Sequence, residues 1–291
     1  MTEFESKKIL GVRVDFGMSM EDVLSRLEKM LLEKNKHHLI CTTNAEFIMD
    51  AQTDPKFKSI LNGADLSVPD GVGVLFANYF LTKSAHINNP VAKLLWGLGF
   101  GVSSLFVNYP VGDKISGVDL SLEILKMSSK TNYSVFFLGG HPKDFWGNAI
   151  VPAPFDMATL AASKVRELYP HVNIIGATSS FNRNPSDDEA TVEYIKKCMK
   201  EKGVKELDFI FIAYNHKYQE NWFIRNAPKI PVKIGLGIGG TFDYLSGYLN
   251  RPTSYKFEWL KKIFIRPTKI SRILRAFPIF PIQVFIDSIR K

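Results

Sequence analysis

The chain is poor in cysteine and lacks the residue patterns that identify several common enzyme classes. Its 291 residues include only 2 cysteines, Cys41 and Cys198, and neither has a partner at metal-ligand spacing. This excludes a disulfide scaffold and a zinc ribbon, and it is typical of a reducing compartment. The sequence has no P-loop, no G-x-S-x-G elbow, no H-E-x-x-H motif and no Asp-x-Asp pair. Assignments to NTPases, hydrolases and metalloenzymes are therefore weak.

Long apolar segments are absent as well. No run of about 18 apolar residues is free of charges and of Gly or Pro breaks, so no transmembrane helix is predicted. The opening residues, MTEFESKKIL, are polar and acidic, whereas a signal peptide begins with a basic region and an apolar core. Hydrophobic residues make up 45% of the chain and charged residues 23%, as in a globular protein of one large or two small domains. We expect a cytoplasmic location.

The positive charge of the chain is concentrated at its end. The formal net charge is +8. Residues 251–291 contain ten Lys or Arg and two Asp or Glu, whereas residues 1–250 contain 27 of each sign. A basic patch of this kind is either a solvated surface or a contact for an anionic partner: a nucleic acid, an anionic membrane or a phosphorylated substrate.

Buried strand patterns alternate with helical patterns as far as residue 250. Strands are predicted at 8–16, 37–43, 66–68, 133–139, 172–178, 207–214 and 232–238, with helices between them. This order predicts an α/β fold with a mostly parallel sheet and helices on both faces. Ligands of such sheets bind beyond the carboxyl ends of the strands.

Two segments interrupt the alternation. Residues 82–113 are apolar and punctuated by Gly and Pro, and residues 145–156 are rich in Pro. Long connections in a compact domain are usually functional or mobile. The first segment is consistent with a helical hairpin packed on the core or with a contact to a membrane or an acceptor.

Polar residues at two strand ends are the first candidates for chemistry. Thr42, Thr43 and Asn44 follow one strand and offer hydroxyls, an amide and backbone N–H groups, although Asn44 or Thr43 could equally cap the next helix. Asp70 follows another strand, in Pro69-Asp70-Gly71. It is either a helix cap or a general base for a hydroxyl group.

Glycine turns follow two further strands. Gly139-Gly140 ends one of them, and Gly235-Leu-Gly-Ile-Gly-Gly240 ends the other. Glycine lets backbone amides approach a phosphate closely. The second turn differs from the dinucleotide fingerprint in its spacing and has no acidic residue about 20 positions later, so it is weak support for NAD binding.

Together these motifs resemble the WecG/TagA/CpsF family of bacterial glycosyltransferases. The matching pieces occur in the order of the family: TTNAEFI, ADLSVPDGVGV, SGVDL, FFLGG, YQENW, IGLGIGGTFDYLSGYLNRP, FEWL and RPTKISRILR. The match covers nearly the whole chain. The resemblance implies a Rossmann-like core of the glycosyltransferase E type over residues 1–250. It also implies a basic helical appendage over residues 251–291 that faces the membrane.

The resemblance also implies an activity. Family members are inverting, metal-independent enzymes that transfer an N-acetylmannosamine-type or uronic acid sugar from UDP to a polyprenyl-diphosphate-linked sugar. Their products enter teichoic acid or other cell-surface polysaccharides. We therefore expect a UDP-sugar donor, a lipid-linked acceptor and the inner face of an anionic membrane as partners. No nucleic acid, metal or cofactor is implied, and homo-oligomer formation is left open.

Individual positions carry over from the family motifs. Asp70 matches the proposed catalytic base, and Thr42 matches the Thr of the T-x-N motif and is counted with the catalytic residues. Substrate contacts are implied at Asn44, Gly71, Asp119, Gly139, Gly140, Gln219, Gly239, Gly240, Arg251 and Arg272.

This chain departs from the family at two places. Asn215-His216 and Lys217-Tyr218 replace small residues and Pro-Lys before Gln219, and Lys114 and Ser116 stand near the positions of an Arg and a Thr. Two rival interpretations remain: a non-catalytic membrane adaptor and a nucleotide-binding oxidoreductase.

Overall fold

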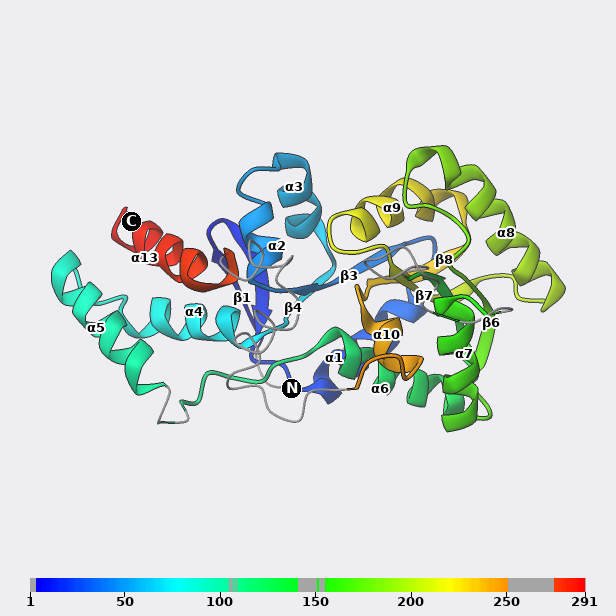
Figure 1. Cartoon of the computed structure of the whole chain (residues 1–291), viewed down its shortest axis with the longest axis horizontal. Helices are drawn as coiled ribbons and strands as arrows, with labels where there is room; N and C mark the ends of the chain where they lie inside the picture. Colours follow the sequence, from blue (N-terminus) through cyan, green and yellow to red (C-terminus); the bar gives the residue numbers. More distant parts are fainter. Residues whose placement is uncertain are drawn as a thin grey trace.

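A computed structural model of the chain contains a six-stranded parallel sheet at its centre (Figure 1). The structure describes residues 4–104, 107, 109–140, 151, 155–250 and 275–290. The strand order is β4-β3-β8-β7-β5-β6, and every pair in it is parallel. The strands are β3 (His38–Thr43), β4 (Leu66–Pro69), β5 (Ser134–Gly139), β6 (Asn173–Thr178), β7 (Leu207–Ala213) and β8 (Val232–Gly237).

Helices cover both faces of the sheet, as the sequence predicts. Phe136 belongs to one hydrophobic cluster and Phe137 to the other, because successive side chains of a strand point to opposite faces. The first cluster takes in α2 (Ala45–Asp50), α3 (Pro55–Gly63), α4 (Val72–Lys83), α8 (Asp188–Glu201) and α9 (Tyr218–Asn226). The second takes in α1 (Met20–Leu32), α6 (Gly117–Thr131), α7 (Met157–Leu168) and α10 (Thr241–Leu245).

The N-terminal segment differs from its prediction. A single strand over residues 8–16 is wrong: β1 (Glu5–Ile9) and β2 (Val12–Phe16) form an antiparallel hairpin. Leu10 and Gly11 have φ values of 50° and 77°, the two positive angles that a tight hairpin turn requires. The carboxylate of Asp15 accepts a hydrogen bond from the backbone N–H of Ser67 at 2.8 Å. This bond attaches the hairpin to β4.

The apolar segment 82–113 contains the end of α4 and a second helix, α5 (Pro90–Ser103). Asn89 caps α5 by accepting hydrogen bonds from the N–H groups of Val91 and Ala92. Trp96 of α5 lies 5.8 Å from the ring of Phe80 in α4, between ring centroids. Residues 90–103 of this segment are therefore helical and pack against α4. Together with α13 (Phe280–Arg290), these helices form one end of the molecule (Figure 1).

The end of the chain returns to the core. After a kinked segment at Arg275–Ile279, α13 buries Phe280 and Val284 in the first hydrophobic cluster. Among the described residues, none of the helices is long and apolar enough to cross a bilayer. Arg251 and Arg272 lie outside the described residues, as does most of the Pro-rich segment 145–156.

The packing of α9 on β8 gives the first testable prediction. A Cβ atom at Gly235 would overlap the ring of the fully buried Phe223, so Gly235→Ala should lower the free energy of unfolding by about 1–3 kcal/mol or more. Urea denaturation measures this change. The control is Gly99→Ala, which has open space around it inside α5 and should be neutral or raise stability by up to about 1 kcal/mol. Equal effects of the two substitutions would contradict the packing argument.

Candidate active site

The candidate site lies at the carboxyl edge of β3, β4 and β8. Thr42 pairs with Val68 and Thr43 with Pro69 across β3 and β4. The pairing continues past the end of β4, because the N–H of Asp70 donates to the carbonyl of Thr43 at 2.9 Å. Asp70 is thereby placed next to the Thr42–Thr43 strand end.

Asp70 precedes the cap of the helix that follows it. The N-cap of α4 is Gly71, whose φ of 99° lies in the region that favours glycine, and it makes no side-chain capping bond. Asp70 therefore lies one position ahead of the N-cap residue. Its side chain is half-buried at the strand end, where a carboxylate can meet a substrate hydroxyl.

The start of α6 approaches two hydroxyl groups. A Cβ atom at Gly117 would lie 3.4 Å from Oγ1 of Thr42 and 3.8 Å from Oγ1 of Thr241. Thr42 is the last residue but one of β3 and Thr241 begins α10, so three segments far apart in the sequence meet here. A connection from the edge of β4 reinforces the arrangement, since the N–H of Ile115 donates to the carbonyl of Pro69 at 3.0 Å.

Two predicted substrate contacts have structural partners of their own. Oδ1 of Asn44 accepts hydrogen bonds from the N–H groups of Glu46 at 2.9 Å and Phe47 at 3.1 Å, so the capping role of Asn44 is confirmed. The carboxylate of Asp119 accepts a hydrogen bond from Ser116 Oγ, and the N–H of Asp119 donates back to that oxygen at 3.1 Å. This reciprocal pair caps α6.

Gln219 supports the loop after β8. Its side chain is 1% exposed. Its Oε1 accepts from the N–H of Gly239 at 3.0 Å, and its Nε2 donates to Oε1 of Glu220 at 2.8 Å. Gly237 lies against both side chains, and a Cβ atom there would overlap them. Gln219 therefore fixes the Gly239-Gly240 turn that leads into α10 and Thr241.

Glu220 is a buried carboxyl beneath the same turn. Its Oε2 has no hydrogen-bond partner within the described residues. Burial, the largest effect, disfavours the charged form and raises the pKa of Glu220 to about 7. Burial also raises the pKa of the Cys41 thiol on the neighbouring strand well above its usual value, and the charge of Glu220 adds to that rise.

The Gly139-Gly140 turn is separate from this group. It ends β5, which is three strand positions from β3, or roughly 14 Å across the sheet. The turn is closely packed: a Cβ atom at Gly139 would lie 2.8 Å from the ring of Tyr214, and one at Gly140 would lie 3.0 Å from Met157. The structure does not bring these glycines together with Asp70.

The structure also reveals a charged cluster that the sequence did not predict. Asp50 at the end of α2 accepts from Nε2 of His216 at 2.8 Å, and its other oxygen bonds to Arg275. His216 stacks on Phe47, with ring centroids 5.1 Å apart. Lys217 forms an ion pair with Asp54 at 2.7 Å. The departures at 216 and 217 thus hold α9 and the C-terminal segment against α2 and α3.

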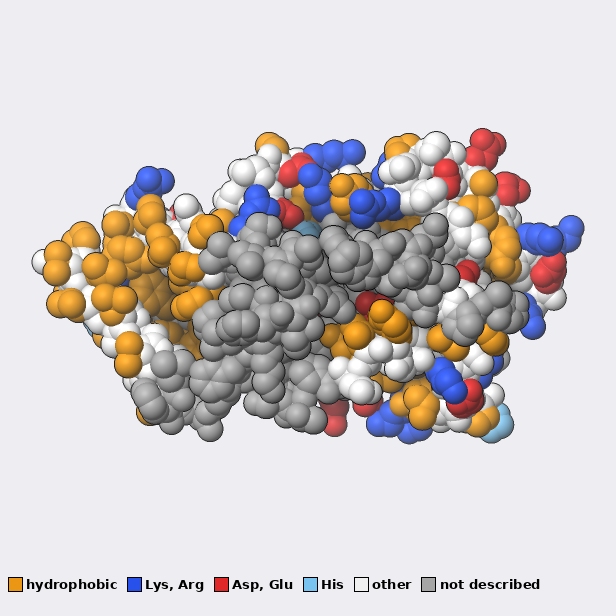
Figure 2. Space-filling model, in the orientation of Figure 1, with side chains coloured by type: hydrophobic (Ala, Val, Ile, Leu, Met, Phe, Trp, Pro, Cys, Tyr) orange, Lys and Arg blue, Asp and Glu red, His pale blue; other side chains and the backbone are white. Residues whose placement is uncertain are grey.

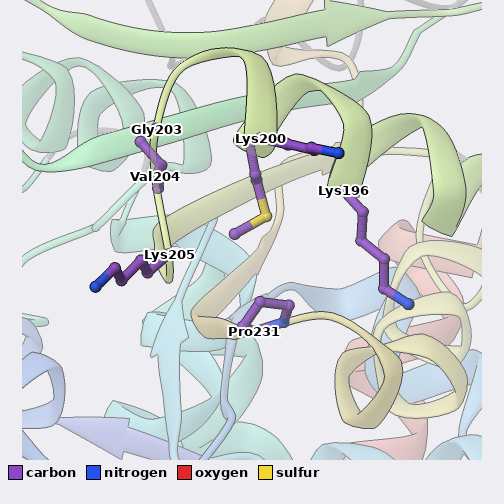
Figure 3. A pocket seen from close by; sticks show the side chains of 7 residues that line it. Lys196, Lys200, Gly203, Val204, Lys205 and Pro231 are labelled. Carbon is purple, nitrogen blue, oxygen red and sulfur yellow. The ribbon is translucent and has the colours of Figure 1, made fainter.

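A separate hollow of about 410 Å³ lies on the opposite edge of the sheet. Three lysines, Lys196, Lys200 and Lys205, line it together with Met199, Gly203, Val204 and Pro231 (Figure 3). Its residues 203–205 and 231 come just before β7 and β8, at their amino ends. Ligands of α/β sheets bind at the carboxyl ends of the strands, so this hollow lies on the side of the sheet away from the candidate site at Asp70.

In the parts of the chain that the structure describes, no three His, Cys, Asp or Glu side chains gather as a metal site.

The family model described as "Glycosyl transferase WecG/TagA/CpsF family" matches residues 7–98 and 87–291. This chain belongs to that family. It is a glycosyltransferase, and the resemblance read from its motifs is confirmed.

Curated relatives agree with this assignment. The chain is 23% identical over 267 residues to a protein of Bacillus spizizenii, covering 90% of this chain and 85% of the relative. It is 23% identical over 281 residues to a protein of Staphylococcus aureus strain NCTC 8325, covering 95% and 91%. Both relatives are named N-acetylglucosaminyldiphosphoundecaprenol N-acetyl-beta-D-mannosaminyltransferase.

The raised pKa of Glu220 predicts a pH dependence of stability. The folded protein holds this proton more tightly than the unfolded chain, whose carboxyl titrates near 4.5. The free energy of unfolding should therefore fall as the pH rises from about 4.5 to 7. Glu220→Gln has no carboxyl to titrate and should not lose this stability. At about 1.4 kcal/mol per pKa unit, the stability of the variant relative to the wild type should be roughly 3 kcal/mol greater at pH 8 than at pH 4.5.

Urea denaturation of both proteins at several pH values measures the difference. Glu193→Gln, which changes an exposed carboxylate of α8, is the control and should leave the wild-type pH profile unchanged. A Glu220→Gln profile parallel to that of the wild type would refute the assignment.

Proposed function

We propose that this chain transfers an N-acetylmannosamine-type sugar, with inversion, from a UDP-sugar to a polyprenyl-diphosphate-linked sugar. The single observation that carries the proposal is the placement of Asp70, which lies at the carboxyl end of β4 beside Thr43 and ahead of the helix cap. The names of the relatives support the transferred sugar and the lipid-linked acceptor. The UDP donor rests on the family resemblance.

The proposed reaction needs a base on one side and stabilised negative charge on the other. Asp70 takes the proton from the acceptor hydroxyl as its oxygen attacks the anomeric carbon. The bond from that carbon to the diphosphate breaks, and the electron pair leaves with UDP. Backbone N–H groups and Arg or Lys side chains stabilise the leaving group. We assign the diphosphate contacts to Arg251 and Arg272, which lie outside the described residues.

We further propose that the enzyme is peripheral on the inner face of the membrane, with residues 251–291 as its membrane-facing appendage. The charge of this segment supports an anionic partner. Its described part is attached to the core near the site: Arg275 pairs with Asp50 in the helix that Asn44 caps.

The role of Asp70 can be tested with Asp70→Asn. The substitution keeps the size of the side chain and removes its basicity, so turnover should fall by about 10²–10⁴-fold while the protein stays folded. The measurement is UDP release with a lipid-linked acceptor, alongside a thermal melt. Asp113→Asn changes an exposed carboxylate on the segment leading to α6 and should keep wild-type turnover. Turnover of Asp70→Asn within a few-fold of wild type would rule out Asp70 as the base.

Metal independence is the second test of the mechanism. The sequence has no Asp-x-Asp pair, with which many sugar transferases hold Mg²⁺ or Mn²⁺. Transfer should therefore proceed at its full rate after dialysis against EDTA. If EDTA abolishes transfer and Mg²⁺ or Mn²⁺ restores it, this part of the proposal fails.

A further inference from the structure

One side of α5 exposes a continuous apolar stripe. Val91, Leu94, Leu95, Leu98 and Val102 follow helical spacing, and each is between 42% and 65% exposed. The other side of the helix is packed: Trp96 and Phe100 stack on each other, and their rings contact Phe80 and Phe76 of α4. The stripe is therefore the outer face of a helix that is firmly held from behind.

Further apolar side chains are exposed near the end of the chain. Phe277 and Ile279 lie just before α13, and Ile282 lies within it. Nζ of Lys93 in α5 donates to the carbonyl of Ser288 in α13 at 3.0 Å, and Phe80 of α4 lies between Trp96 and Phe285 of α13. In Figure 2 hydrophobic side chains gather at this end of the molecule. The three helices form one unit with a large apolar surface.

The charges around this surface indicate what covers it. No Asp or Glu occurs from Gly71 to Gly112, and the charged side chains in this range are Lys83 and Lys93. Asp287 of α13 lines a hollow against Gly11 and Lys58, on the side of the hairpin. An apolar helix face without acidic residues, in a chain whose residues 251–291 are rich in Lys and Arg, matches the interface of an anionic bilayer.

We propose that α5 and α13 insert their exposed apolar faces into the acyl boundary of an anionic membrane. Each helix lies in the interface, since neither is long enough to span it. This contact is distinct from charge attraction by residues 251–274. It rests on the proposed function only for its purpose, which is to bring the site to a lipid-anchored acceptor.

Helix α4 connects the proposed membrane contact to the candidate site. The helix begins two residues after Asp70 and ends at the apolar surface, and its 12 residues span about 18 Å. Asp70 is therefore held at a fixed height above the bilayer by a packed helix. The family model matches the chain in two segments, and the residues that they share, 87–98, include most of α5.

Sedimentation with vesicles tests the inserted surface without any substrate. The vesicles contain phosphatidylglycerol and phosphatidylcholine, and the buffer contains about 0.5 M salt, which screens attraction by exposed charges. Leu95→Glu/Leu98→Glu should weaken the partition of the full chain into vesicles by about tenfold or more, because two inserted Leu side chains become charged. The control Leu32→Glu/Leu168→Glu adds the same charge at residues that are 80% and 64% exposed on α1 and α7.

The control should bind vesicles within about twofold of wild type, and thermal melts should find all three proteins folded. Wild-type binding by the α5 variant would overturn the proposal, as would failure of the wild-type protein to sediment with vesicles. So would unchanged vesicle binding with an altered mass in light scattering, which would make the surface a contact between copies. If the α5 substitutions weaken vesicle binding but the wild-type protein does not transfer sugar, the proposed function is refuted and the membrane contact still holds.

Discussion

The close approach of α9 to β8 is the contact on which the arrangement of the site depends. Gly235 and Gly237 have no side chains, so Phe223, Gln219 and Glu220 can lie directly against the strand. Gln219 then holds the backbone of Gly239. That bond sets the turn into α10, and the first residue of α10, Thr241, meets Gly117 of α6 beside Thr42. One helix packed against one strand thereby sets the turn that brings Thr241 to the start of α6 and to Thr42.

The contact between α9 and β8 also buries a carboxyl group, which is energetically unfavourable. Glu220 is fully buried with one oxygen unpartnered among the described residues, and burial raises its pKa. A buried apolar residue of similar size avoids this penalty. The carboxyl instead accepts the Nε2 hydrogen of Gln219, which leaves Oε1 of Gln219 directed at Gly239. The polar pair thus orients an amide whose two ends could otherwise be exchanged.

The parallel sheet was predictable because its strands are buried on both faces and read as continuous apolar runs. The hairpin was not, because its turn uses Leu10 in a left-handed conformation rather than an Asn-Gly pair. Asp70 and Thr42 were found at strand ends, where polar residues interrupt apolar runs. Thr241 was missed although it directly follows the Gly239-Gly240 pair. Gln219 was predicted as a substrate contact, but its burial and its bonds to Gly239 and Glu220 depend on how α9 packs.

The cluster of Asp50, His216 and Arg275 had no signal in the sequence. Its members are 166 and 225 positions from Asp50, and each is an ordinary surface residue type. Only the return of the chain to α2 brings them together. The same holds for Lys93, which is buried and whose ammonium group donates a hydrogen bond to the carbonyl of Ser288.

The bonds of Arg275 and Lys93 hold the end of the chain against the core. Arg275 is bonded to α2, Lys93 joins α5 to α13, and Phe280 and Val284 are part of the core. The segment between residues 251 and 274 therefore connects two anchored points. A protease that cuts a single bond within it leaves α13 seated on α4 and α5. Removing everything beyond Asn250 instead uncovers the apolar surface beneath α13, so a shortened protein is a poor stand-in for the intact enzyme.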